Sequence, residues 1–170
     1  MILTRTRARG FDILAHSMGA LLTMEVVGQS ALMQNLNSTG KLKNLMLASH
    51  DIDLGLFRSQ LRQIGNVPAN IYVFVSEDDF ALNISRRLSG GVDRVGDAPA
   101  EDLFDLGVTV IDLSQIENSA SGSHAKFTGS PEVVQLIGRR LKDDNFGSPD
   151  NDPAVVEVLN GIPVLRALVD

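Results

Sequence analysis

Residues 11–20 read FDILAHSMGA, and this stretch is the most informative part of the sequence about the fold. An apolar run leads directly into Ser17, helical spacing begins at Met18, and the small residues Ala15 and Gly19 stand two positions to either side of the serine. This is the G-x-S-x-G pattern of a nucleophile elbow, with alanine in its first small position. It predicts a sharp strand-to-helix turn that lifts the Ser17 oxygen above the carboxyl edge of a sheet, where the N–H of Met18 points at a developing oxyanion.

The same stretch has a simpler interpretation, in which a strand ends at a helix-capping serine. The elbow interpretation adds a steric expectation. A side chain larger than a methyl group at position 15 or 19 should collide with the neighbouring strand or helix.

Further apolar runs rich in β-branched residues follow over residues 42–48, 70–76 and 107–113. Like residues 11–15 they are almost continuously apolar, which is typical of parallel strands covered on both faces. Apolar residues recur at helical spacing over residues 18–33, 54–64 and 132–141. Strands that alternate with helices predict an α/β fold with a doubly wound, mostly parallel sheet of about four strands. We expect this domain to span residues 1–142, followed by a loop and a short terminal helix within residues 143–170.

Composition excludes several classes of protein. With 15 Lys and Arg against 21 Asp and Glu, a net charge of −6 and 5% aromatic residues, the chain lacks the basic face of a nucleic-acid binder. It has no cysteine, and therefore no disulfide framework, thiol catalysis or cysteine zinc site. No signal-like or membrane-spanning apolar run is visible, which predicts a soluble chain and leaves its compartment open. No zinc, calcium or phosphate-loop motif is complete, so we expect no metal and no cofactor.

A serine nucleophile in this fold needs an acid and then a histidine, each in a loop after a later strand. His124 follows the fourth predicted strand in the small-residue loop SASGSH, where a base could reach over the carboxyl edge. His16 is adjacent to Ser17 in an extended segment, so its side chain should leave the opposite face.

For the acid, the third predicted strand ends in SEDDFAL, which offers Asp78 and Asp79. We prefer Asp79, whose carboxylate would orient the imidazole by accepting its Nδ1–H. Asp51 and Asp53, after the second strand, are alternative acids. Acidic residues in such loops also commonly solvate a turn or cap the next helix.

Four separated blocks resemble one known family. They read ILAHSMG at 13–19, LASHDID at 47–53 with FRSQ at 57–60, YVFVSEDDFAL at 72–82 with SRRL at 85–88, and GSHAKF at 122–127. In order and spacing they resemble the bacterial esterase/lipase-like α/β-hydrolase proteins of unknown function, over residues 10–141. The resemblance implies that Ser17 is the nucleophile, Asp79 the acid and His124 the base. The chain departs from this family at His50, where proline is usual.

A second departure is that such proteins carry much of their fold before the nucleophile strand. The chain therefore resembles the carboxyl-terminal half of an α/β hydrolase, with a nucleophile strand that has one unpaired edge. A lost second oxyanion donor would cost about 10² to 10³ in rate. We expect a serine hydrolase of a small-molecule ester or acyl substrate; the alternative is a non-catalytic remnant or interaction module. The exposed edge could associate with an amino-terminal half or with another copy of the chain.

Overall fold

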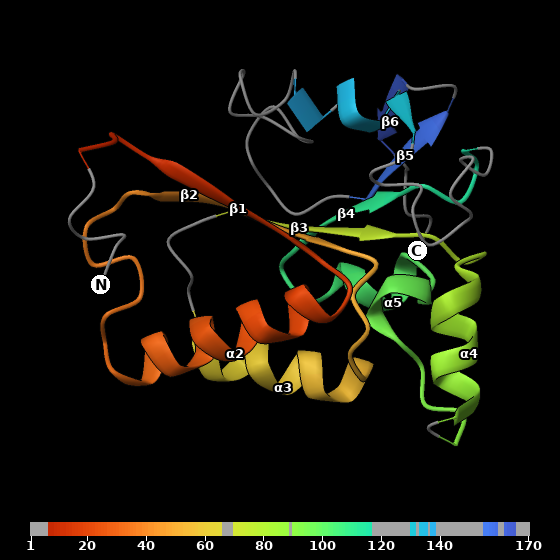
Figure 1. Ribbon diagram of the computed structural model, residues 1–170, viewed down its shortest axis with the longest axis horizontal. Helices are drawn as coiled ribbons and strands as arrows, with labels where there is room; N and C mark the ends of the chain where they lie inside the picture. The colour runs from red at the N-terminus through yellow and green to blue at the C-terminus, as the bar shows by residue number, and fades with distance from the viewer. Residues whose placement is uncertain are drawn as a thin grey trace.

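The protein is described by a computed structural model over residues 7–65, 70–88, 90–116, 130–131, 133–135, 137–138, 155–159 and 162–165. Within these residues one sheet of six strands runs in the order β1-β2-β3-β4-β5-β6 (Figure 1). The strands are β1 Phe11–His16, β2 Leu42–Ala48, β3 Asn70–Val75, β4 Thr109–Asp112, β5 Val155–Leu159 and β6 Ile162–Leu165. The strands from β1 to β5 pair in parallel and β6 is antiparallel to β5, which confirms the mostly parallel α/β sheet.

Helices cover both faces of this sheet. They are α2 Met18–Leu32, α3 Leu54–Ile64, α4 Phe80–Leu88 and α5 Glu101–Phe104, with a 3₁₀ turn η1 at Val95–Asp97. Helices α2 and α3 lie side by side under β1 and β2 (Figure 1). The described residues between 131 and 138 are helical and pack on the other face. The predicted doubly wound arrangement is therefore present.

The strand sequences explain this layering. Alternate residues of β2 and β3, such as Leu45 and Val73, enter the cluster beneath α2 and α3, whereas Met46 and Phe74 enter the opposite cluster with Val133. Each of these side chains is at most 1% exposed. Strands buried on both faces need the continuous apolar runs that the sequence contains.

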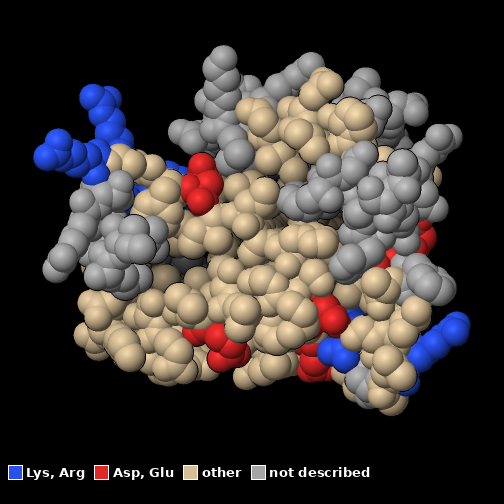
Figure 2. All heavy atoms as spheres, viewed as in Figure 1, with Lys and Arg blue, Asp and Glu red and all other residues tan. Residues whose placement is uncertain are grey.

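Strand β1 is the end strand of the described sheet. Leu14 is 47% exposed on one of its faces. Helix α2 buries Met24 and Val27 but also exposes an apolar stripe that contains Leu22 and Val26, and uncharged residues cover most of this side of the molecule (Figure 2). A helix that is apolar on two sides is typical of a helix with a neighbour on each side.

The terminal segment corrects one prediction. Where the sequence suggested a short helix over residues 154–169, the structure has the antiparallel hairpin strands β5 and β6. Val155, Val156 and Val158 are β-branched, and the pairing of Leu159 with Ile162 leaves the sequence Asn-Gly between them. β-branched runs around Asn-Gly favour a two-residue hairpin, so the helix prediction was wrong.

Among the described residues, no helix combines the length and the apolar character that crossing a bilayer requires.

Candidate active site

Ser17 occupies a strained turn between β1 and α2. Its backbone has φ 53° and ψ −127°, a region that non-glycine residues rarely adopt. The N–H of Ser17 donates to the carbonyl oxygen of Ala48 at 2.9 Å, which extends the β1–β2 pairing by one residue before the chain turns into the helix. Strain of roughly 1–3 kcal/mol at one residue is common at active sites and persists only where the surroundings impose it.

The side chain of Ser17 does not act as a helix cap. Although Ser17 is the N-cap residue of α2, it makes no side-chain capping hydrogen bond, and no hydrogen bond to its hydroxyl is present among the described residues. A serine that only terminates the strand would place its oxygen on an N–H of the first helical turn. The strained backbone therefore presents a hydroxyl that the local fold does not use.

The first turn of α2 supplies an unused N–H. The N–H of Ala20 donates to the Ser17 carbonyl at 2.9 Å, whereas no acceptor for the N–H of Met18 is present in the described part of the chain. Helix α2 has 15 residues, so the positive end of its dipole lies at the same place. The Met18 N–H is thus available to an anionic oxygen next to Ser17.

The two small flanking residues differ in their surroundings. Ala15 is buried in the core at 7% exposure. A Cβ built on Gly19 has no neighbouring atom within 4 Å, so the crowding predicted at this position is not found. Gly19 lies in the first turn of α2 beside the end strand, where the described residues leave space open.

Asp79 is completely buried after β3 and caps α4. Its Oδ1 accepts the N–H of Ala81 at 3.1 Å and that of Leu82 at 3.2 Å, and its side chain is 0% exposed. Asp78 is exposed and accepts the Ser76 hydroxyl at 2.5 Å. Of these two candidate acids, the structure therefore fixes Asp79 more firmly and removes it from bulk water.

Asp51 and Asp53 have structural partners. Asp53 caps α3 by accepting the N–H of Leu56 at 2.6 Å. Asp51 accepts the Ser85 hydroxyl at 2.8 Å and lies 3.5 Å from Nε of Arg94. Near the carboxyl edge, Asp53 therefore caps a helix, and Asp51 links the chain after β2 to Ser85 and Arg94.

Ser17 and Asp79 follow parallel strands at the same edge of the sheet, with β2 between their strands. Adjacent strands lie about 4.8 Å apart, so the axes of β1 and β3 are separated by roughly 10 Å. An imidazole with a hydrogen bond of about 2.8 Å on each side spans most of that interval. His124, the predicted base, lies outside the described residues.

His50 has an environment that the sequence did not reveal. It is 0% exposed, its ring meets Phe57 edge-on with centroids 5.2 Å apart, and neither ring nitrogen has a hydrogen-bond partner among the residues that the structure describes. Burial lowers the pKa of His50 to about 3. A neutral, enclosed imidazole of this kind contributes to packing and is not open to a substrate.

A second buried carboxylate, Asp97, lies near Asp79 and was missed by the sequence reasoning. Burial raises its pKa, Arg86 opposes the rise, and the charge of Asp79 adds to it. The available signal was the position of Asp97 inside residues 89–101, a glycine-rich irregular stretch of the kind that borders sites. Its partner Arg86 lies eleven residues earlier in the chain, so sequence alone did not connect the two.

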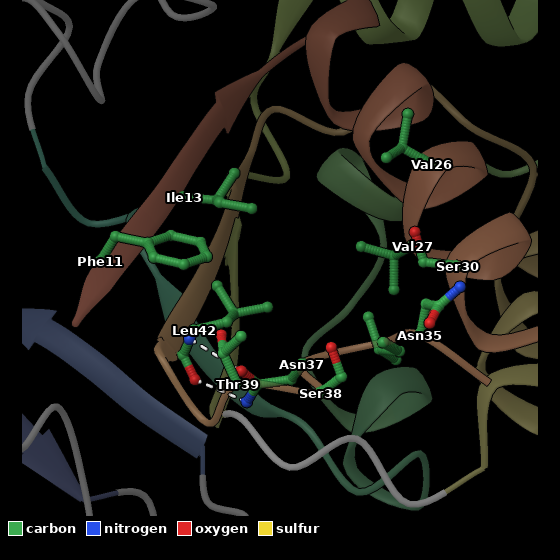
Figure 3. A pocket seen from close by; sticks show the side chains of 11 residues that line it. Phe11, Ile13, Val26, Val27, Ser30, Asn35, Asn37, Ser38, Thr39 and Leu42 are labelled. Atoms are coloured by element: carbon green, nitrogen blue, oxygen red, sulfur yellow. Dashed lines mark hydrogen bonds between the residues drawn. The ribbon is translucent and has the colours of Figure 1, made fainter. Parts of the chain in front are cut away.

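A pocket elsewhere in the molecule does not belong to this site. It is lined by Phe11 and Leu42 at the starts of β1 and β2, together with Val27 and Asn37, whose side chain bonds both backbone groups of Leu42 (Figure 3). This places the pocket at the amino ends of the strands, opposite the edge that carries Ser17. Its volume of about 60 Å³ is also well below that of a typical ligand pocket, roughly 300–1,000 Å³.

Comparison with known proteins gives one match. Residues 1–140 match the model of a family described as alpha/beta hydrolase of unknown function (DUF900). No curated protein matches the chain, and no solved structure matches it.

Proposed function

The chain belongs to this α/β-hydrolase family, and from that premise we propose that it is a serine hydrolase of a carboxylic ester or a related acyl substrate. Ser17 Oγ attacks the carbonyl carbon, while His124 accepts the serine proton and returns it to the leaving group. Asp79 accepts the Nδ1–H of His124, which orients the ring and stabilises the imidazolium. The acyl-enzyme is then hydrolysed by water that His124 activates.

The observation that carries this proposal is the backbone of Ser17. Its φ of 53° and ψ of −127° are costly, and the hydroxyl gains no capping hydrogen bond in return. Strain at a polar residue without a local structural use favours a role in chemistry.

Helix α2 supplies one donor for the oxyanion. The Met18 N–H lies next to Ser17 at the positive end of α2 and has no acceptor among the described residues. A second donor completes the oxyanion hole in hydrolases of this fold, and removal of one donor typically costs about 10² to 10³ in rate.

Intact mass after incubation with a fluorophosphonate tests the proposal. We expect one adduct on the parent chain, located on Ser17 by fragmentation, and none on Ser17→Ala. Ser59→Ala, which removes an exposed serine on α3, is the matched control and should be labelled like the parent. An adduct that survives Ser17→Ala would refute the assignment of the nucleophile.

A non-catalytic interaction module is the second candidate. It is supported by the unpaired outer edge of β1 in the described sheet and by the exposed side chains of Leu14, Leu22 and Val26 beside it. A chain that is folded by circular dichroism and takes up no fluorophosphonate would favour this candidate over the hydrolase.

A further inference from the structure

The orientation of Asp79 depends on the first turns of α4. The carbonyl oxygen of Asp79 accepts the backbone N–H of Asn83 at 3.0 Å and its side-chain Nδ2 at 3.0 Å. Its Oδ1 accepts the N–H groups of Ala81 and Leu82. Because backbone and carboxylate are both bonded to α4, a shift of this helix moves the carboxylate with it.

Arg86 connects this helix to a neighbouring segment. Its Nη2 donates to Asn83 Oδ1 at 2.9 Å, and its Nε lies 3.9 Å from Asp97 Oδ2. Its Nη1 lies 3.4 Å from Oδ1 of Asp93, whose side chain is 66% exposed, whereas that of Asp97 is only 2% exposed. The shorter contact, with Asp93, is exposed to water and therefore screened, whereas Asp97 is shielded from water and interacts with Arg86 through its charge.

Asp97 is the last residue of the segment 93–97, which we call the strap and which is hydrogen-bonded to the ends of two strands. The N–H of Gly96 donates to the His50 carbonyl at 3.0 Å, and the Gly96 carbonyl accepts the N–H of Ser76 at 2.8 Å. The strap is thereby bonded to the chain just after β2 and just after β3. A second contact with the segment after β2 is the bond from the N–H of Val95 to the Ile52 carbonyl at 3.0 Å.

We propose that Arg86 is a positioning residue for Asp79, because it ties the start of α4, through Asn83, to Asp97 on the strap. The strap is hydrogen-bonded to the chain after β2 and after β3, so the sheet fixes its position. Through Arg86 the strap also fixes the position of α4, and the Asp79 carboxylate is thereby held at the carboxyl edge. The catalytic importance of this link rests on the proposed function, in which Asp79 orients the base. A misplacement of about 1 Å far from the reacting atoms can cost about 10² in rate.

The test compares Arg86→Gln with Arg87→Gln in the full chain. Arg87 is the next residue of α4, is exposed, and has no side-chain partner among the described residues. Hydrolysis of p-nitrophenyl acetate is measured per active site, with sites counted by fluorophosphonate labelling of Ser17. We expect Arg86→Gln to lower kcat by about 10- to 100-fold with little change in KM, since Asp79 acts on the transition state. Arg87→Gln should match the parent.

A second readout does not depend on turnover. Amide hydrogen exchange at Ala81 and Leu82, the two donors to Asp79, should accelerate about tenfold in Arg86→Gln and stay unchanged in Arg87→Gln. Asp97→Asn should reproduce both effects, and the double variant should be no worse than either single one, because both act through one link.

The outcomes separate the two proposals. A parent that is not labelled at Ser17 refutes the proposed function. A labelled parent whose kcat per site and whose Ala81 and Leu82 exchange survive Arg86→Gln refutes the positioning role and leaves the proposed function standing. Should Arg86→Gln not fold, Arg86→Lys serves in its place, because lysine keeps the charge but lacks the planar fork that reaches Asn83 and Asp97 together.

Discussion

The N–H of Gly96 donates to the carbonyl oxygen of His50 at 3.0 Å, and a Cβ on Gly96 would lie 2.5 Å from the backbone nitrogen of His50. The strap therefore crosses the chain after β2 at a distance that no side chain permits. This contact brings residues 46 positions apart to the carboxyl edge, close to Asp79.

Gly96→Ala should destabilise the protein by about 1–3 kcal/mol, because the added methyl meets backbone atoms of His50 and Ser49 that cannot rotate away. Urea unfolding measures the change. Gly28→Ala is the matched control: its Cβ would have no neighbour within 4 Å, and alanine in the middle of α2 should stabilise by up to about 1 kcal/mol. Equal midpoints for the parent and Gly96→Ala would contradict the close contact.

His50 should make stability depend on pH. Burial lowers its pKa from 6.5 to about 3 in the folded state, so the unfolded chain binds the proton more readily. His50 therefore does not lower the free energy of unfolding above pH 6.5. As the pH drops from 6.5 toward 3, that free energy should fall by up to about 1.4 kcal/mol per pH unit. Asp97, whose pKa is raised, has the opposite sign and offsets part of this fall.

His50→Leu isolates the histidine contribution. Leucine fills a similar volume and leaves no unpaired nitrogen, so unfolding free energies of the parent and the variant should diverge progressively below pH 6.5. Parallel curves for the two proteins would show that the pKa of His50 is the same in the folded and the unfolded chain.

The strained backbone of Ser17 predicts that glycine is more stable than alanine at this position, the reverse of their order inside a helix. Glycine adopts positive φ without steric cost, so Ser17→Gly should be more stable than Ser17→Ala by about 1 kcal/mol, although neither is labelled by fluorophosphonate. At Ser59, in the middle of α3, the order should reverse, since glycine there costs about 1 kcal/mol relative to alanine. Thermal unfolding of the four variants gives both differences, and the same order at both positions would exclude strain at Ser17.

The sequence predicted the strands better than the site, for a physical reason. Strands β2, β3 and β4 are almost wholly buried, so their apolar runs are visible without knowledge of their neighbours, and β2 has the predicted bounds Leu42–Ala48. Helix α4 was not predicted, because its nine residues give only a short stretch of helical apolar spacing. The engagement of Asp51 by Ser85 and of Asp97 by Arg86 depends on contacts between separate elements, which no local pattern encodes.

The alternative acids have a direct test. Asp51→Asn and Asp53→Asn keep an oxygen for the bonds to Ser85 and Leu56, and both should be labelled at Ser17 at the parent rate. Loss of labelling in either variant, with folding intact, would move the acid role from β3 to the end of β2.

Asp79 combines a structural role with the proposed catalytic one, and two substitutions separate them. Asp79→Asn retains an oxygen for the N–H groups of Ala81 and Leu82, so stability should change by less than about 1 kcal/mol. The amide cannot hold the imidazole of His124 in the reactive tautomer as a carboxylate does, so labelling of Ser17 should slow by up to about 10⁴-fold. Asp79→Ala should lose both, with about 1–2 kcal/mol of stability from the missing cap. Urea unfolding and the rate of fluorophosphonate uptake measure the two roles separately. If Asp79→Asn were labelled at the parent rate, Asp79 would be a helix cap alone.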